Sequence, residues 1–251
     1  MNTLLELKNI NLTYQTLKSE TEAIKNVSFN VNEGDFVSIV GPSGSGKTTI
    51  LSIISGLIKA TSGTVLLDGE AVNGISTKIG YMFQRDNLFE WLNVLQNIKL
   101  GPKINSGKNC LSKDKILELV KKYGLDGFEK AKQSELSGGM RQRVSLIRTL
   151  ALNPKLLLLD EPFSALDYQT RLAVQNDIFK IIKSENKTAI LVTHDISEAI
   201  SMSDKIIVLS KRPGTVKQII NLDFAKYFSP IERRENPEFN KYFKILWETL
   251  Q

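Results

Sequence analysis

Residues 36–56 read FVSIVGPSGSGKTTILSIISG, and this stretch decides the fold. Its first five residues form a continuous apolar run, which predicts a strand buried on both faces. A glycine-rich turn follows, and helical spacing then continues to Gly56, a residue type that commonly ends a helix. The order of strand, glycine loop and helix predicts a phosphate-binding arrangement.

The turn matches the Walker A pattern GxxxxGK(S/T) without deviation. Its glycines allow backbone N–H groups to converge on phosphate oxygens, and the positive end of the helix dipole points at them. We expect Lys47 to neutralise phosphate charge and Thr48 to offer its hydroxyl to Mg²⁺. The residues expected to bind ATP here are Gly41, Pro42, Ser43, Gly44, Ser45, Gly46, Lys47, Thr48 and Thr49.

Apolar patterns extend this unit in both directions. Alternation over 4–14 and 23–31 predicts an opening antiparallel layer, and helical spacing over 91–153 predicts a helical insertion. Strand and helix patterns then alternate, which predicts a parallel sheet. Further strands are expected at 64–67, 79–83, 156–159, 189–193, 205–209 and 215–222, and helices at 168–183, 196–202 and 238–250. The last helix has an apolar face that favours packing on the core over partner binding, formed by Phe239, Tyr242, Phe243, Leu246 and Leu250.

Bulk composition is that of a globular protein, with 251 residues, 41% hydrophobic and 24% charged. The chain has no apolar run long enough for a spanning helix. The first residues lack a secretory signal, and the single cysteine, Cys110, can form no intramolecular disulfide, so we expect a cytoplasmic address. The net charge of +6 comes from scattered Lys and Arg and gives no argument for a nucleic-acid partner.

Two carboxylates follow the apolar run 156–159. Ligands of open α/β sheets bind at the C-terminal ends of strands. We therefore expect Asp160 to hold Mg²⁺ through water, and Glu161 to orient or deprotonate the attacking water. Alone, such a pair is more often a solvated turn, but the Walker A loop reverses that interpretation.

The stretch LSGGMRQRV at 136–144 combines a helix-capping serine with two glycines that permit close approach. It resembles the signature motif of the ABC ATPase family, whose other landmarks fall in order along nearly the whole chain. The resemblance implies an α/β fold: a P-loop NTPase (RecA-like) parallel-sheet core with an N-terminal antiparallel β layer and a helical insertion subdomain. It also implies that Ser137, Gly138 and Gly139 contact ATP.

Other residues acquire a role only through this resemblance. Gln84 is similar to the Q-loop glutamine, which contacts Mg²⁺ and the attacking water, and SALD at 164–167 resembles the D-loop, with Asp167 at the nucleotide. Tyr14 stands where an aromatic residue stacks on adenine, the alternative being an ordinary strand tyrosine. His194, the only histidine, corresponds to the switch histidine that donates to the γ-phosphate. The expected catalytic residues are thus Glu161, His194 and Gln84, and the expected metal ligands are Thr48, Gln84 and Asp160.

The signature motif also implies a second ATPase subunit. In the family, the motif closes over the γ-phosphate held by the partner's Walker A loop, so that two chains bury two ATP molecules. Each motif occurs once here, so the second site must come from another chain. A C2 homodimer and a heterodimer with a close paralogue both satisfy this requirement.

The stretch FQRDNLFEWLNVLQNI at 83–98 resembles the importer branch that handles nitrate, aliphatic sulfonates, taurine, bicarbonate and some vitamin precursors, although Glu90 stands where proline is usual. That branch implies two transmembrane permease subunits and, indirectly, an extracytoplasmic substrate-binding protein, with this chain peripheral on the cytoplasmic side of the cell membrane. We expect the permease to dock near Gln84. The large apolar residues at 88–92 are either part of that interface or the core of the helical insertion.

Two rival functions fit the sequence less well. ABC ATPases that act on nucleic acid or ribosomes usually carry two cassettes or a long coiled-coil insertion, and neither is seen here. A module that binds ATP without turnover is disfavoured by the presence of both Glu161 and His194. We therefore expect one ABC ATPase domain over 1–251, made of a catalytic core (1–90 and 154–222), a helical signature subdomain (91–153) and a C-terminal helical extension (223–251).

Overall fold

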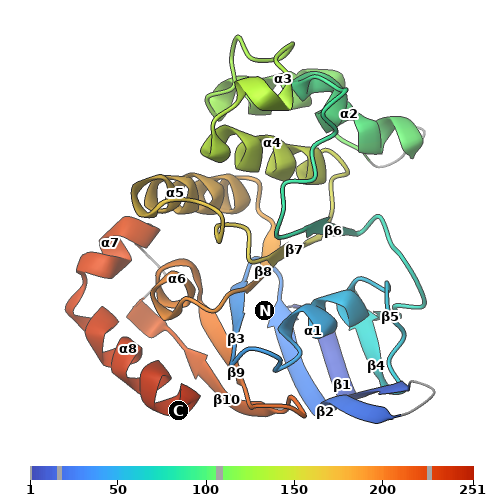
Figure 1. Ribbon diagram of the computed structural model, residues 1–251, viewed down its shortest axis with the longest axis vertical. Coiled ribbons are helices and arrows are strands. Elements are labelled where there is room, and N and C mark those ends of the chain that lie inside the picture. Colours follow the sequence, from blue (N-terminus) through green and yellow to red (C-terminus); the bar gives the residue numbers. More distant parts are fainter. Residues whose placement is uncertain (1, 16–18, 106–109, 225–227) are drawn as a thin grey trace. The chain divides into compact units, whose positions relative to one another are not determined.

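The computed structural model describes residues 2–15, 19–105, 110–224 and 228–251 (Figure 1). They form two compact units: unit 1 comprises Met1–Ser76 and Thr188–Gln251, and unit 2 comprises Thr77–Lys187. Residues 106–109 of the expected insertion and 225–227 of the expected extension lie outside the described residues. The core, signature subdomain and C-terminal extension expected from the sequence have boundaries that differ from those of the two units. That division stays a prediction.

The antiparallel sheet of unit 1 has the strand order β2-β1-β4-β5. Its strands are β1 (Thr3–Gln15), β2 (Glu20–Asn32), β4 (Ser62–Leu67) and β5 (Glu70–Ala71). In β1, the buried Leu5 and Leu7 are followed by the buried Ile10 and Leu12, so the alternation skips one residue. Asn9 has a φ of 51° there, and the pairing with β2 shifts register. A β-bulge therefore keeps the apolar side chains of a long strand directed at the core.

The parallel strands of unit 1 position the phosphate loop. β3 (Phe36–Val40) lies between β8 (Thr188–Val192) and β9 (Lys205–Leu209) and is parallel to both, and β10 (Val216–Asn221) pairs antiparallel with β9. Every residue of β3 and of β8 is buried. Their largely apolar sequences, interrupted only by Ser38 and Thr188, have this cause, because a strand covered on both faces has no solvent side.

The helices described in unit 1 are α1 (Lys47–Ile54), α6 (Ile196–Met202), α7 (Pro230–Glu235) and α8 (Pro237–Leu250). The prediction that the apolar face of α8 packs on the core is confirmed, because Phe239 and Leu246 are buried in one cluster with Ile200 of α6 and Val208 of β9. α7 was not predicted. Its start signals are complete, since Ser229 forms a capping box with the third residue of the helix and proline follows it, but six residues are too few to show helical periodicity.

Unit 2 joins a pair of parallel strands to a helical cluster. The strands are β6 (Ile79–Met82) and β7 (Leu156–Asp160), and the helices are α2 (Val94–Ile104), α3 (Lys113–Lys122), the 3₁₀ helix η1 (Gln133–Glu135), α4 (Gly138–Leu150) and α5 (Tyr168–Ser184). The helices α2, α3 and α4 bury a common core that includes Ile98, Leu119 and Ile147. Asn93 starts α2 with a capping box to Gln96.

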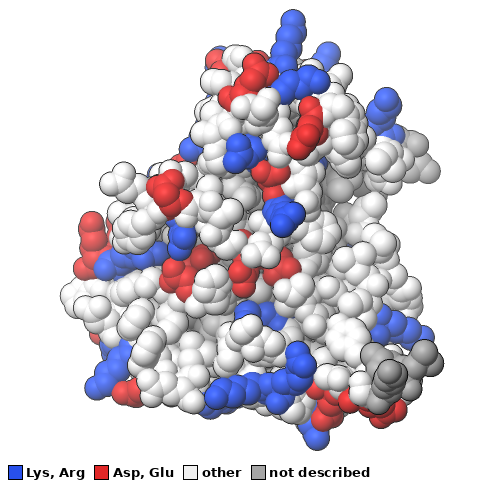
Figure 2. Space-filling view, in the orientation of Figure 1, with Lys and Arg blue, Asp and Glu red and all other residues white. Residues whose placement is uncertain are grey.

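The surface shows charges of both signs on each unit. On the face drawn in Figure 2, Lys and Arg side chains are interspersed with Asp and Glu. Within the residues described, no helix combines the length and the apolar character needed to span a bilayer.

Candidate active site

The phosphate loop of unit 1 runs from Gly41, directly after β3, to Gly46, directly before α1. Gly44 and Gly46 have φ values of 75° and 87°, in the left-handed region that favours glycine. A Cβ on Gly46 would overlap Cδ1 of Ile24, a fully buried residue of β2. Position 46 therefore requires glycine for its backbone and for its space. As the N-cap residue of α1 it offers no side-chain acceptor, so the start of the helix suits an external anion.

The Lys47 side chain folds back on this loop. It is 9% exposed, and Nζ donates hydrogen bonds to the carbonyl oxygens of Gly41 at 2.8 Å and Pro42 at 3.0 Å. These neutral acceptors fix the position of the ammonium without cancelling its charge. The Lys47 ammonium is thus held at the start of α1. Its charge and the positive end of the helix dipole both favour an anion there.

Among the other residues predicted to bind nucleotide in unit 1, Ser45 is buried, whereas Thr48, Thr49 and Tyr14 are at least partly accessible. Thr48 is exposed and Thr49 is partly buried in the first turn of α1. Tyr14, near the end of β1, is 42% exposed. Its ring is therefore not a core residue, and it can accept a flat apolar ligand on its face.

His194 is exposed and follows the fully buried strand β8. The residues on both sides of it are fixed. Thr193 is 1% exposed; its Oγ1 donates to Glu198 Oε2 at 2.9 Å and accepts from the backbone N of Asp195 at 3.0 Å. The carboxylate of Asp195 in turn caps α6 by accepting from the backbone N of Glu198 at 3.1 Å. The backbone that carries the imidazole is thus anchored at its neighbours, and sequence reasoning missed Thr193 and Glu198.

Asp160 ends β7 in unit 2 and is 6% exposed. The hydroxyl of Tyr81, on the adjacent parallel strand β6, donates to Asp160 Oδ2 at 3.1 Å. A buried carboxylate needs such donors, and this one also fixes the orientation of the group. Tyr81 was not predicted, because its partner is close only through strand pairing.

Glu161 lies next along the chain with a φ of 44°, a left-handed conformation that is uncommon for a residue with a side chain. Gln84 Nε2 donates to Glu161 Oε2 at 3.5 Å and to Ser164 Oγ at 3.3 Å, and Ser164 Oγ donates to the Glu161 carbonyl at 3.0 Å. The structure therefore brings together the predicted Q-loop glutamine, the predicted catalytic glutamate and the first residue of the SALD stretch. Strained backbone at such a position is typical of functional sites.

The signature and SALD stretches both form helix starts in unit 2. Ser137 caps α4 by accepting from the backbone N of Met140 at 3.3 Å, and Asp167 caps α5 by accepting from the backbone N of Thr170 at 3.0 Å. Hydrogen bonds from Thr170 lower the pKa of the Asp167 carboxyl. A Cβ on Gly139 would lie 2.9 Å from Cγ2 of Val174 on α5. Glycine at 139 thus permits close packing of α4 on α5, beside any role in ligand binding.

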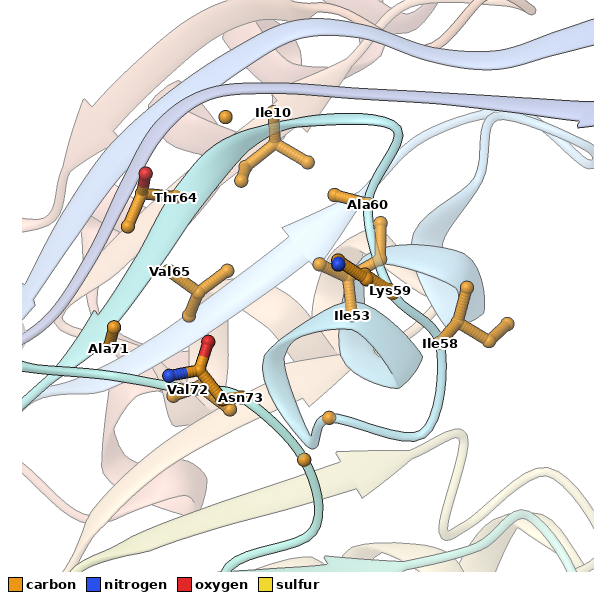
Figure 3. Close-up of a pocket in the computed structure, with 13 residues that line it drawn as sticks. Ile10, Ile53, Ile58, Lys59, Ala60, Thr64, Val65, Ala71, Val72 and Asn73 are labelled. Carbon is orange, nitrogen blue, oxygen red and sulfur yellow. The ribbon is translucent and has the colours of Figure 1, made fainter.

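A cavity of about 480 Å³ in unit 1 contains none of the predicted site residues (Figure 3). It is lined by Ile10, Ile53 and Val65 among others, with Lys59 and Asn73 at its wall (Figure 3). We assign it no part in nucleotide binding. The predicted residues at 14, 41–49 and 194 lie in unit 1, and those at 84, 137–139, 160, 161 and 167 lie in unit 2.

Comparison with known proteins agrees with these features. A family model described as "ABC transporter" matches residues 24–164. YtlC of Bacillus subtilis, an uncharacterized ABC transporter ATP-binding protein, is 47% identical over 98% of this chain and 95% of its own. The taurine import ATP-binding protein TauB of Pelagibacter ubique is 40% identical over 87% of this chain and 83% of its own.

A solved structure supports the same conclusion. The dimeric ATP-binding cassette MJ0796, in a post-hydrolysis state bound to ADP and Pi, is 38% identical, with a TM-score of 0.73 over 87% of this chain and 99% of that one. The predicted fold class, an α/β P-loop NTPase, is confirmed by this likeness. The chain belongs to the ABC transporter family, as an ATP-binding subunit with ATPase activity.

Proposed function

We propose that this ATPase subunit energises an importer for a small anionic solute, such as taurine or another sulfonate, nitrate, or else a vitamin precursor. The observation that carries this proposal is the 40% identity to a taurine import ATP-binding protein over 87% of the chain. The stretch at 83–98, which resembles the same importer branch, agrees with it. The solute itself would be selected by other subunits of the importer.

ATP binding would use the residues at 41–49, with Tyr14 stacking on the adenine. The left-handed glycines and the helix start without a side-chain cap support the phosphate contacts. Lys47, already held at the loop by two carbonyl groups, would shift its hydrogen bonds to phosphate oxygens. Charge-assisted hydrogen bonds to phosphate are stronger than those to neutral carbonyls, so the exchange is favourable.

Mg²⁺ fits the donor set that the sequence predicts. Thr48 offers a hydroxyl, Gln84 an amide oxygen and Asp160 a carboxylate fixed by Tyr81, and hard cations prefer oxygen ligands. Protein Mg²⁺ sites commonly use one or two carboxylates together with substrate phosphates, so no larger acidic cluster is required. When bound, the ion would neutralise charge on the β- and γ-phosphates.

Hydrolysis would depend on three side chains with separate tasks. Glu161 would orient or deprotonate the attacking water, and Gln84, which donates to the Glu161 carboxylate, would hold that carboxylate and the water in line. His194 would donate to the γ-phosphate from an anchored backbone. Positioning and electrostatics supply most of the catalysis in phosphoryl transfer, so fixed neighbours at each group support these assignments.

Assembly as a dimer would complete the site. The signature residues 137–139 and Asp167 would contact ATP held by a second ATPase subunit, in a homodimer with C2 symmetry. The likeness to a cassette solved as a dimer with ADP and Pi supports this arrangement. A heterodimer with a close paralogue has the same geometry.

Two permease subunits would dock beside the Q-loop of unit 2. Leu88 is buried in the helical core, whereas Trp91 is 70% exposed and its ring lies tilted against that of Phe89, with centroids 4.9 Å apart. Of the two interpretations of this stretch, the helical core therefore applies at residue 88, and residue 91 is accessible to a partner. Next to it lies a groove of about 440 Å³ with a net basic lining of three lysines, one glutamate, three leucines and two amides, namely Lys99, Lys103, Lys130, Glu129, Leu92, Leu95, Leu100, Asn93 and Gln96. Such a groove suits an amphipathic permease segment with acidic side chains.

This assignment places the chain at the cytoplasmic side of the cell membrane as a peripheral subunit, with an extracytoplasmic substrate-binding protein acting on it only through the permease. It involves no nucleic acid. The test is to express the chain with the permease and binding protein encoded beside its gene and to reconstitute them in proteoliposomes. We expect ATP hydrolysis to rise when the binding protein carries taurine. Hydrolysis that does not respond to any loaded binding protein, with no permease co-purifying, contradicts the proposal.

A charge test addresses the docking groove. Lys99→Glu with Lys103→Glu should reduce co-purification of the permease, because both lysines line the groove that would receive acidic side chains. Lys121→Glu, on the exposed side of α3, is the matched control and should leave co-purification unchanged.

A further inference from the structure

Asp86, two residues after Gln84 in unit 2, accepts three hydrogen bonds with its carboxylate. Its Oδ2 accepts from Arg141 Nε at 3.1 Å, and its Oδ1 accepts from Gln133 Nε2 at 3.0 Å and from the backbone N of Leu88 at 3.2 Å. The side chain is 18% exposed and that of Arg141 is 35% exposed, so the ion pair is partly shielded from solvent. Such a pair is stronger and better ordered than a surface pair.

One face of α4 holds the backbone of the same segment. Arg141, Ser145 and Arg148 are spaced by four and three residues, which places them on one side of a helix. Ser145 Oγ donates to the Asp86 carbonyl at 3.2 Å, and Arg148 donates to the carbonyls of Asp86 and Asn87, each at 2.7 Å. Arg148 is partly buried, and this burial lowers the pKa of its guanidinium.

The guanidinium of Arg141 also reaches the signature stretch. Its NH1 donates to the Leu136 carbonyl at 2.8 Å, one residue before the helix cap Ser137. One side chain therefore contacts both the start of the signature and the carboxylate that anchors the segment after Gln84. At the other end, Gln84 contacts Glu161 and Ser164. Hydrogen bonds at Asp86 and at Gln84, joined by the backbone of residues 84–86, thus connect the signature to the predicted catalytic glutamate within unit 2.

We propose that Asp86 and Arg141 are positioning residues that couple the signature stretch to Gln84, so that engagement of the signature sets the contact between Gln84 and Glu161. The inference rests on the roles proposed above for Gln84 and Ser137. Arg141 is required as arginine, because its planar fork donates to Leu136 and to Asp86 at once and a lysine ammonium at the same place cannot match both directions. Neither residue touches the reacting atoms.

The test compares isosteric and conservative variants of the purified chain, with ATP and Mg²⁺. Asp86→Asn removes the charge but keeps an acceptor for Leu88, and Arg141→Lys keeps the charge but loses the fork. We expect both to lower kcat roughly 3- to 30-fold with KM for ATP unchanged, because coupling and not nucleotide binding is lost. The matched control is Asp177→Asn, which removes the partner of Arg143 on another face of α4, at 2.9 Å, and should leave kcat unchanged.

A double variant separates positioning from a general effect on the fold. If Asp86 acts through Gln84, adding Asp86→Asn to Gln84→Ala lowers kcat no further than Gln84→Ala does alone. Multiplicative losses, or equal losses in Asp177→Asn, overturn the inference while leaving the role of Gln84 in place. If Gln84→Ala itself leaves kcat unchanged, both the proposed role of Gln84 and this inference fail. Arg141→Lys keeps a helix-favouring residue in α4, so the comparison stands even if Asp86→Asn does not fold.

Discussion

Left-handed backbone at Gly46 and at Glu161 of the candidate site has different physical causes. Gly46 has a φ of 87° and must also lack a Cβ, because the side chain of Ile24 occupies that space. Glu161 has a φ of 44° although it carries a long side chain. Glycine adopts left-handed backbone without strain, so the residue type at position 46 suits its conformation. Glutamate at position 161 does not, and such strain is expected where function requires the carboxylate.

Two costs of replacing Gly46 can be measured separately: the strain of left-handed backbone and the overlap with Ile24. Gly46→Ala should destabilise unit 1 by about 2–4 kcal/mol, combining about 1–2 kcal/mol for a Cβ in the left-handed region with the overlap on Ile24. Gly69→Ala is the matched control, because Gly69 has a φ of 76° and open space around its Cβ position, so it carries only the backbone cost. Adding Ile24→Val, which removes Cδ1, should recover part of the loss at position 46. The free energy of unfolding in denaturant measures all three, and equal losses at 46 and 69 would refute the packing argument.

The role proposed for Glu161 makes a separate prediction. Glu161→Gln keeps the size and the contact with Gln84 but loses the base, so ATP should still bind while kcat falls by about two orders of magnitude or more. Glu118→Gln, an exposed glutamate of α3 in the same unit, serves as control. Nucleotide binding by equilibrium dialysis and phosphate release are the measurements. Retention of full hydrolysis by Glu161→Gln would show that another group activates the water.

At the scale of elements, the sequence predicts what local patterns encode. β3, β8 and β9 were expected from continuous apolar runs, and α6 from its spacing, because each of these signals lies within one short segment. α7 was missed because six residues give no period, and β5 because it has only two. The hydrogen bonds of Tyr81 with Asp160 and of Thr193 with Glu198 were also missed. In the first, the choice of partner follows from strand pairing; in the second, from the turn into α6, and neither has a periodic signal in the sequence.

One of the two elements that the sequence did not predict, α7, is anchored by a buried cation. Arg233 of α7 is 1% exposed and donates to the carbonyls of Phe228 at 2.9 Å and Ser203 at 2.8 Å and to the Asp204 carboxylate at 3.5 Å. Burial lowers its pKa to about 10, so it remains charged at neutral pH. These contacts attach α7 to the segment between α6 and β9.

Loss of this attachment should be costly. Arg233→Ala should lower the free energy of unfolding by about 3 kcal/mol, because it leaves two carbonyls and a carboxylate without this donor and opens a cavity. Arg234→Ala, at the next and partly buried position of α7, should cost less than about 1 kcal/mol. Denaturant unfolding at pH 7 measures both. Equal effects at 233 and 234 would show that α7 is held by helix packing and not by the buried cation.

At the scale of the whole molecule, the proposed dimer can be tested by mixing two inactive chains. Lys47→Ala removes the phosphate-binding cation, and Ser137→Arg blocks the signature, so a homodimer of either variant lacks both composite sites. A heterodimer of the two has one intact site, made from the Lys47 loop of one chain and the signature of the other. An equimolar mixture should therefore recover ATP hydrolysis, to at most about a quarter of the wild-type rate, since half of the dimers are mixed and each has one of two sites. Ser137→Arg should still bind ATP, because its own phosphate loop is unchanged. If the signature acted on ATP held by its own chain, each variant would stay inactive whatever its partner, and no mixture would hydrolyse ATP.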